Sequence, residues 1–108
     1  MMRTRRRRTD RNQVIYYIRN VVTNEFYIGL TAVNFNGSVK RTLHRRMQKH
    51  LQRAMTENKD WGLCQNLRDF GAESFVYGPL ETVRGKGPAH AREVVLIKQY
   101  DAALNTAK

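Results

Sequence analysis

The sequence has few of the features that crosslinked or membrane-spanning proteins need. It contains one cysteine, Cys64, so it cannot form an internal disulfide. Its apolar runs are all shorter than the roughly 20 residues that a membrane span requires. Paired arginines occur near the N-terminus, but no apolar signal core of adequate length follows them. We therefore expect a protein of the reducing cytoplasm, without a membrane partner.

Acidic residues are also scarce. The chain has nine Asp and Glu residues against 20 Lys and Arg residues, which gives a formal net charge of +11 at pH 7. This excess of positive charge favours a polyanionic partner, and nucleic acid before a membrane surface. Charge alone does not separate an enzyme from a ribosomal or architectural protein.

The 108 residues are enough for one domain and too few for two cores. Residues 1–12 contain six arginines and one acid, Asp10, and such a block of like charge is expected to be disordered. We interpret residues 1–12 as an arm that follows nucleic-acid phosphates, and residues 13–108 as the folded domain. A solvated tail without a specific role is the alternative. The arginines at the centre of the arm are Arg5, Arg6, Arg7 and Arg8.

Two stretches after the arm have the composition of β-strands. Residues 14–19 and 25–31 are rich in β-branched and aromatic residues, and a polar break separates them, which predicts an antiparallel hairpin. Alternation places Tyr16 and Tyr27 on the same face of this hairpin. Gly29 lies within the second strand and indicates close approach by a ligand or another backbone.

Two helices are predicted next. Ser38 is a suitable N-cap for a helix that runs to about Met55 with an apolar stripe along one side. Asp60 can cap a second helix, which ends at Gly71. Cys64 lies on the apolar stripe of this second helix, so we interpret it as a core residue rather than a nucleophile.

A strand and a helix complete the domain. Residues 74–80 have strand composition, and Pro79 indicates that the end of this strand lies at an edge or a bulge. A helix is predicted from residue 89 to about residue 100, with Pro88 at its first position. The expected fold class is α+β, with a small three-stranded antiparallel sheet flanked by about three helices.

Three basic residues follow the edge of the apolar stripe on the first predicted helix. Arg46, His50 and Arg53 are spaced at i, i+4 and i+7, so they border the buried face. Exposed side chains on an ordinary amphipathic helix are the alternative interpretation. The remaining basic residues of this helix lie largely away from that row and are expected to face solvent or nucleic acid; they are Lys40, Arg41, Arg45 and Lys49.

One carboxylate is predicted to be at a buried position. Glu93 shares a helix face with Ala89 and Leu96, and a carboxylate there needs a cation or hydrogen-bond donors. An ion pair with Arg46 or another base would meet this need. A metal site would also meet it, because Mg²⁺ in phosphate chemistry is commonly held by one or two carboxylates with water and substrate oxygens.

The sequence resembles the GIY-YIG nuclease superfamily over about residues 13–105. Residues 14–16 read Val-Ile-Tyr and residues 27–29 read Tyr-Ile-Gly, similar to the two tripeptides that name the family. The later landmarks of the family follow in order at Arg46, His50, Glu93 and Asn105.

Two positions depart from the family pattern, and one assignment has competitors. Val14 replaces the first glycine of the name motif, and Leu30 stands where some members have a basic or polar residue. Arg41 and Arg45 compete with Arg46, because Arg41 lies nearer to the spacing that is usual in compact members. We prefer Arg46 because it has a histidine at i+4.

The resemblance implies an endonuclease that hydrolyses DNA phosphodiester bonds with one divalent ion, Mg²⁺ or Mn²⁺. It implies that Glu93 holds the ion and that Arg46 contacts the scissile phosphate. Tyr16 and Tyr27 would lie beside the attacking water, with Tyr16 preferred as the base and His50 able to take its proton. The remaining residues implied to contact DNA or to orient the site are Gly29, Arg53 and Asn105, with the arginines of the arm.

The resemblance further implies a stand-alone domain similar to small phage-encoded endonucleases, which would act in the cytoplasm of a host cell. Such a domain would gain sequence preference by forming a homodimer or from a specificity partner. Two alternative functions stay open. One is a non-catalytic nucleic-acid-binding protein with the same fold, and the other is a structure-selective nuclease acting on branched or flapped DNA.

Overall fold

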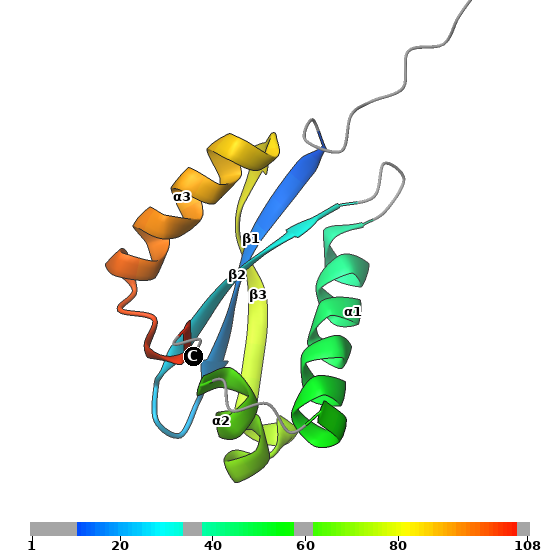
Figure 1. The fold of residues 1–108 in the computed structure, drawn as a ribbon, viewed down its shortest axis with the longest axis vertical. Helices are drawn as coiled ribbons and strands as arrows, with labels where there is room; N and C mark the ends of the chain where they lie inside the picture. Colours follow the sequence, from blue (N-terminus) through cyan, green and yellow to red (C-terminus); the bar gives the residue numbers. More distant parts are fainter. Residues whose placement is uncertain (1–10, 34–37, 58–61, 106–108) are drawn as a thin grey trace, which may run out of the picture.

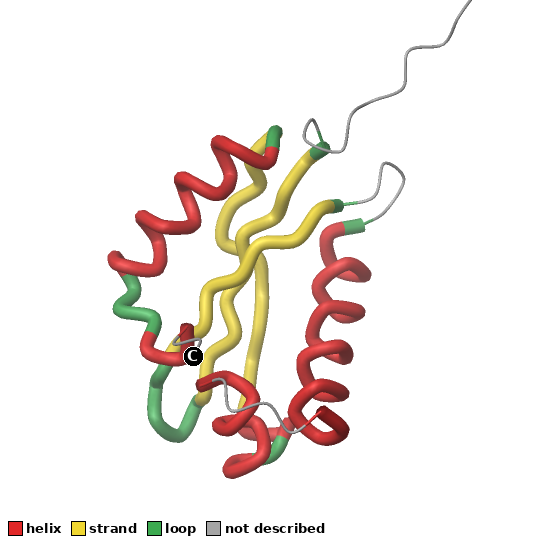
Figure 2. The backbone as a smooth tube through the Cα atoms, in the orientation of Figure 1, coloured by secondary structure: helices red, strands yellow, loops and turns green. Residues whose placement is uncertain are grey.

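The computed structural model describes residues 11–33, 38–57 and 62–105, and it contains a three-stranded antiparallel sheet between helices (Figure 1). Helices α1 and α3 lie on opposite sides of the sheet, and α2 lies near one end of it (Figure 2). This arrangement confirms the predicted α+β class. The main elements are β1 (Asn12–Asn20), β2 (Phe26–Ala32), α1 (Val39–Gln52), α2 (Gly62–Phe70), β3 (Phe75–Arg84) and α3 (Lys86–Gln99).

Strand β1 is the middle strand, in the order β2-β1-β3, and is covered on both faces. Alternate side chains of a strand point to opposite faces. Tyr16 therefore packs in a core shared with α1 and α2, which includes Leu43 and Leu67. Ile15, on the other face, packs in a cluster with Leu96 of α3. The two helical layers are thus held to the sheet by adjacent residues of one strand.

The hairpin register places Tyr16 directly opposite Gly29. Tyr27 pairs with Ile18, so both tyrosines lie on the face that α1 covers, as predicted. A Cβ atom added at Gly29 would lie 2.4 Å from Cζ and from the hydroxyl oxygen of Tyr16. The space at Gly29 is filled by the side-chain ring of Tyr16, and not by the ligand or backbone expected from the sequence.

Strand β3 is longer than predicted. Tyr16 pairs with Pro79 and Ile15 pairs with Glu81, so Leu80 is an extra residue in a bulge. Pairing resumes beyond the bulge and continues to Arg84, whereas the predicted strand ended at Leu80. Pro79 lies at this irregularity on an edge strand, as expected for a residue that cannot donate a ladder hydrogen bond.

Helix α3 begins at Lys86, three residues before its predicted start. Gly85 precedes the helix with a φ of 93°, a conformation that glycine adopts without steric cost, so the chain passes directly from β3 into α3. Pro88 is the third residue of the helix rather than the first. It still lies in the first turn, where its missing N–H leaves no helical hydrogen bond unmade.

The first and second helices follow the prediction closely. The Ser38 hydroxyl accepts a hydrogen bond from the Arg41 N–H at 3.0 Å and caps α1. A wider π-helical turn, Arg53–Glu57, continues α1 beyond Gln52. Helix α2 ends before Gly71, whose φ is 81°. The predicted cap Asp60 lies outside the described residues.

Strand β1 starts two residues before the strand that the sequence predicted at residues 14–19. Asn12 is the first residue of β1, and the carbonyl of Arg11 accepts a hydrogen bond from the Gly85 N–H at 3.0 Å. Residues 1–10 of the predicted arm lie outside the described residues. Within residues 11–33, 38–57 and 62–105, no helix has the length and apolar character that crossing a bilayer would require.

Candidate active site

The hydroxyl of Tyr16 is the junction of a buried polar cluster. It lies 2.9 Å from Nε2 of His50 and accepts a hydrogen bond from Nε of Arg46 at 3.2 Å. Strand β1 supplies Tyr16, while α1 supplies the other two residues from successive turns. Tyr16 is 2% exposed and His50 is 6% exposed. The structure therefore brings together three of the residues predicted for the site.

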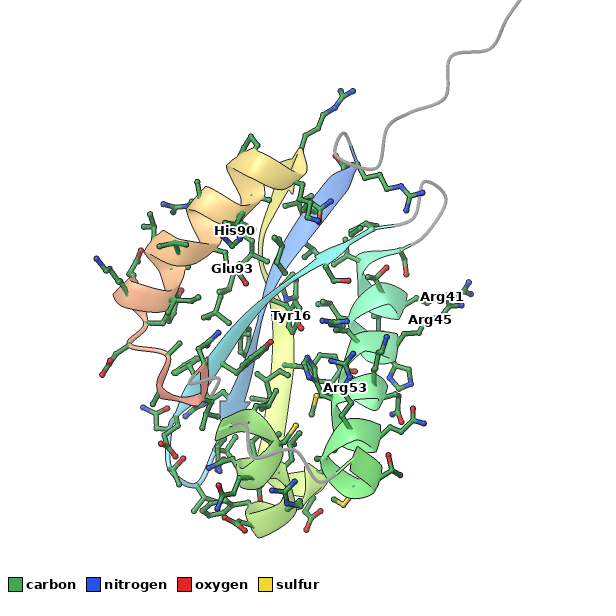
Figure 3. All side chains as sticks on the ribbon, viewed as in Figure 1. Tyr16, Arg41, Arg45, Arg53, His90 and Glu93 are labelled. Carbon is green, nitrogen blue, oxygen red and sulfur yellow. The ribbon has the colours of Figure 1, made fainter. Side chains whose placement is uncertain are left out.

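The geometry also separates Arg46 from its competitors. Arg46 is partly buried and bonds to Tyr16, whereas Arg41 and Arg45 are exposed and point away from the sheet (Figure 3). Arg46 is thus the arginine of α1 whose position fits the predicted role. The phase of the helix explains this difference, because only the i, i+4 row with His50 borders the buried face.

The donors and acceptors of the cluster show how His50 is bonded to Tyr16. A guanidinium can only donate, so Tyr16 accepts from Arg46 and can donate its own proton to His50. This requires a neutral imidazole with its proton on Nδ1. Burial, followed by the positive charges of Arg46 and Arg53, lowers the pKa of His50 to about 4. The ring is therefore neutral near pH 7 and is a proton acceptor for the phenol.

Tyr27 lies against this cluster and is half-buried. Its ring centroid is 5.3 Å from that of His50, in an edge-on arrangement, and 6.2 Å from that of Tyr16. Burial raises the pKa of both tyrosines. The positive charge of Arg46 lowers the pKa of both, but burial outweighs it. Both phenols are therefore protonated near pH 7.

Glu93 lies on the buried side of α3, as predicted. Its side chain is 15% exposed, and Oε1 lies 3.4 Å from Nδ1 of His90. The sequence left Arg46 or another base open as the partner of the carboxylate, and the structure pairs it with His90. Burial raises the pKa of Glu93, while the neighbouring His90 lowers it. The negative charge of Glu93 also raises the pKa of Tyr27, so the carboxylate interacts electrostatically with this tyrosine.

The donor set at Glu93 fits a hard divalent cation. The carboxylate is mostly withdrawn from solvent, and the base beside it is His90. Within the described part of the chain, no group of three or more His, Cys, Asp or Glu side chains could hold a metal ion. One carboxylate, completed by water and phosphate oxygens, is a common arrangement for Mg²⁺ in phosphate chemistry.

Two basic clefts meet at Arg46 and Thr31. The larger has a volume of about 340 Å³, and the smaller of about 190 Å³. The larger is lined by Arg11, Gln13, Leu30, Thr31, Ala32, Arg46 and Lys86. The smaller is lined by Thr31, Thr42, Arg45, Arg46 and Lys49. Sequence reasoning missed Lys86 and Thr31 at this place, because no spacing in the sequence relates them to Arg46.

Asn105 is bonded to strand β2. Its Oδ1 accepts a hydrogen bond from the Ile28 N–H at 2.7 Å, and its Nδ2 donates to the Ile28 carbonyl at 2.7 Å. Ile28 lies between Tyr27 and Gly29, so this pair of bonds ties the C-terminal turn to the strand that carries the site. The predicted role of Asn105 toward the phosphate or Glu93 stays a prediction.

The other predicted contacts fall into two groups. Arg53, in the π-helical turn, lies near enough to His50 for its charge to lower the pKa of that imidazole. The space beside Gly29 holds the Tyr16 ring. DNA contacts by Arg53 and Gly29 stay predictions. Those of the arm lie outside the described residues, at Arg5, Arg6, Arg7 and Arg8.

Comparisons with known proteins identify relatives by structure. No protein-family model matches the sequence, and a search of curated proteins finds no match. The catalytic domain of the homing endonuclease I-TevI is similar at a TM-score of 0.62 and 25% identity, over 86% of this chain and 92% of that domain. A glutamate-to-alanine variant of that catalytic domain matches at a TM-score of 0.63 and 21% identity, over 90% of this chain and 92% of the variant.

The similarity covers most of this chain and most of the I-TevI domain. The I-TevI domain is that of a GIY-YIG homing endonuclease. The present chain has tripeptides similar to the two that name that family on adjacent strands, with Tyr16 of the first opposite Gly29 of the second. The fold of the chain is similar to that of the catalytic domain of a GIY-YIG homing endonuclease, and this similarity supports an endonuclease.

Proposed function

We propose that this chain is a metal-dependent endonuclease that hydrolyses DNA phosphodiester bonds. The observation that supports this most directly is the hydrogen-bonded group of Arg46, Tyr16 and His50, in a domain similar to an endonuclease catalytic domain. The formal charge of +11 and the basic clefts at Arg46 favour a polyanionic substrate.

Arg46 binds the scissile phosphate in this proposal. Its Nε bond to Tyr16 fixes the plane of the guanidinium. The other donors of the planar group are suited to the non-bridging oxygens of a phosphate, and the charge is permanent. Negative charge that develops on those oxygens is stabilised by a donor that is already in place.

Tyr16 and His50 move the proton of the attacking water. Tyr16 accepts a proton from water while it donates its own to Nε2 of His50, 2.9 Å away. A concerted transfer of this kind avoids a free phenolate, which burial disfavours by raising the pKa of Tyr16. Tyr27 is the more exposed phenol, and we assign it to phosphate contact.

Glu93 holds the divalent ion, Mg²⁺ or Mn²⁺. When bound, the ion stabilises negative charge on the phosphate and on the leaving oxygen. Tyr27 interacts electrostatically with both Arg46 and Glu93, so it connects the arginine side of the site with the carboxylate side.

The DNA backbone passes Arg46 along the two clefts. Arg11 and Lys86 line one of them, and Arg45 and Lys49 line the other, so phosphates next to the scissile one meet positive charge. Contact of the arginines in residues 1–10 with DNA phosphates stays a prediction. Sequence preference would come from a homodimer or a specificity partner. The cytoplasmic location predicted from the single cysteine stays a prediction.

Cleavage of supercoiled plasmid tests the proposal. We would incubate the plasmid with the wild type, with Glu93→Ala and with Glu73→Ala, in Mg²⁺ and in EDTA, and verify folding by circular dichroism. Glu73 is an exposed carboxylate on the turn before β3 and serves as the matched control. We expect the wild type and Glu73→Ala to produce open-circle or linear DNA only with Mg²⁺, and Glu93→Ala to produce neither.

Two outcomes would contradict the proposal. Cleavage by Glu93→Ala at the wild-type rate would remove the metal site from the mechanism. A clear mobility shift without conversion of plasmid, and without cleavage of junction or flap oligonucleotides, would identify a non-catalytic DNA-binding protein. Cleavage of branched oligonucleotides alone would identify a structure-selective nuclease that uses the same residues.

A further inference from the structure

A second side chain able to bind a metal ion lies beside Glu93. His90 precedes it by one helical turn on α3, and the two side chains lie side by side (Figure 3). The Nδ1 atom of His90 is 3.4 Å from Oε1 of Glu93. The imidazole is 71% exposed, while the carboxylate is 15% exposed. The pair therefore combines a partly buried oxygen donor with a nitrogen donor at the surface.

We propose that His90 is a second protein ligand of the ion held by Glu93, and that it makes the site prefer Mn²⁺, Co²⁺ or Ni²⁺ to Mg²⁺. This inference rests on the proposed function, because it assigns a ligand to the same metal site. Glu93 and His90 would occupy two adjacent positions around the ion. Water and phosphate oxygens would fill the remaining positions.

The distance between the two atoms fits this arrangement. Metal bonds to carboxylate oxygen and imidazole nitrogen are about 2.0–2.2 Å long, so two such ligands at right angles lie about 3 Å apart. The observed 3.4 Å is longer than the about 2.7–3.2 Å of a usual N–H···O hydrogen bond, and small side-chain rotations would bring both atoms to one ion. A spacing of three residues on one helix face is also the spacing of Glu and His ligands in helical carboxylate metal sites.

The imidazole changes which ions the site favours. Carboxylate, water and phosphate oxygens suit Mg²⁺, whereas imidazole suits the later first-row metals. Affinity of a mixed nitrogen and oxygen site generally rises from Mn²⁺ through Co²⁺ to Ni²⁺. If Glu93 were the one protein ligand, all ligands of the ion would be oxygen atoms, and the site would show little preference along this series of metals. A site with both side chains would discriminate against Mg²⁺.

A simple ion pair on the helix surface makes a different prediction. In that case His90 would only orient the carboxylate, and its removal would change the affinity for every divalent ion to the same extent. A ligand role predicts a selective loss, because Mg²⁺ gains least from a nitrogen donor. The ratio of the affinity for Co²⁺ to the affinity for Mg²⁺ therefore separates a ligand role of His90 from a role in orienting the carboxylate.

Isothermal titration calorimetry on the tag-free full chain, without DNA, measures this ratio. We would titrate CoCl₂ and MgCl₂ into the wild type, His90→Ala and His44→Ala. His44 is an exposed histidine on α1 and controls for weak binding by a surface imidazole. We expect His90→Ala to lose about tenfold or more in affinity for Co²⁺ and less than about twofold for Mg²⁺, while His44→Ala retains both wild-type values.

Each other outcome overturns the inference. Unchanged Co²⁺ affinity in His90→Ala would show that the imidazole is not a ligand, and equal losses for both ions would show that it only orients Glu93. A Glu93→Ala variant in the same titration separates this failure from that of the proposed function. If Glu93→Ala binds Co²⁺ and Mg²⁺ as the wild type does, Glu93 does not hold the ion and the proposed metal site fails. If Glu93→Ala binds neither ion, the metal site stands and only the role of His90 is in question.

Discussion

The stability of the fold should fall as the pH drops from about 6.5 to about 4, because His50 is buried in its neutral form. Burial and the charges of Arg46 and Arg53 lower its pKa to about 4 in the folded chain. A histidine in the unfolded chain has a pKa of about 6.5. As the pH falls, the unfolded state therefore binds this proton first, and the free energy of unfolding declines. Above pH 7 the ring is neutral in both the folded and the unfolded state, so it does not make the free energy of unfolding depend on pH.

The size of the effect follows from the two pKa values. Each unit of difference corresponds to about 1.4 kcal/mol, so the loss between pH 7 and pH 4 is about 3 kcal/mol. This is a large share of the roughly 5–15 kcal/mol that stabilises a typical domain. Urea denaturation followed by circular dichroism at several pH values measures it.

Two histidine variants isolate the contribution of His50. We expect His50→Gln to lose about 3 kcal/mol less than the wild type between pH 7 and pH 4, because glutamine does not titrate. His44→Gln changes an exposed histidine of the same helix and should keep the wild-type dependence. The comparison uses the change with pH, so a general loss of stability in either variant does not affect it. Parallel curves for the wild type and His50→Gln would refute the buried neutral imidazole, and with it the proton acceptor for Tyr16.

Three further predictions concern the site and the arm. Tyr16→Phe should slow single-turnover DNA cleavage by about 10²–10⁴-fold and exceed the effect of Tyr27→Phe; the reverse order would make Tyr27 the base. Gly29→Ala should lower the free energy of unfolding by about 1–3 kcal/mol in a denaturant titration and abolish cleavage, because its Cβ would displace the Tyr16 ring. Gly78→Ala is the matched control, and equal activity in the two variants would contradict this prediction. Deleting residues 1–10 should weaken DNA binding and flatten its dependence on salt in a fluorescence titration, and an unchanged slope would make the arm a passive tail.

Much of the site could be predicted from the sequence because its parts obey local periodicities. A strand repeats every two residues, so Tyr16 and Tyr27 were placed on one sheet face. A helix repeats every 3.6 residues, so Arg46 and His50 were placed together at the border of the buried face. These two rules are independent of the rest of the fold. The contacts of the Tyr16 hydroxyl confirm the placement of Arg46 and His50, and the hairpin register and core packing confirm that of the two tyrosines.

The parts that were missed depend on contacts between distant segments. The bulge at Leu80 arises from pairing with β1, and it lets β3 continue to Arg84. Asn105 binds the backbone of Ile28, which is 77 residues away in the sequence. Lys86 lines a cleft with Arg46 because β3 and α3 meet at the end of the sheet where β1 begins. No local pattern contains this information, since each contact is fixed only when the sheet forms.

The most direct test of the proposed active site compares two adjacent arginines. Arg46 bonds to Tyr16 inside the cluster, and Arg45 is exposed on the same helix and lines one of the same clefts. We would measure the single-turnover rate of plasmid cleavage at saturating protein with Mg²⁺ for Arg46→Ala and Arg45→Ala. We predict that Arg46→Ala is slower than the wild type by about 10²–10³-fold or more, with DNA still bound, while Arg45→Ala cleaves at nearly the wild-type rate. Equal rates for the two variants would contradict the assignment of catalysis to this cluster.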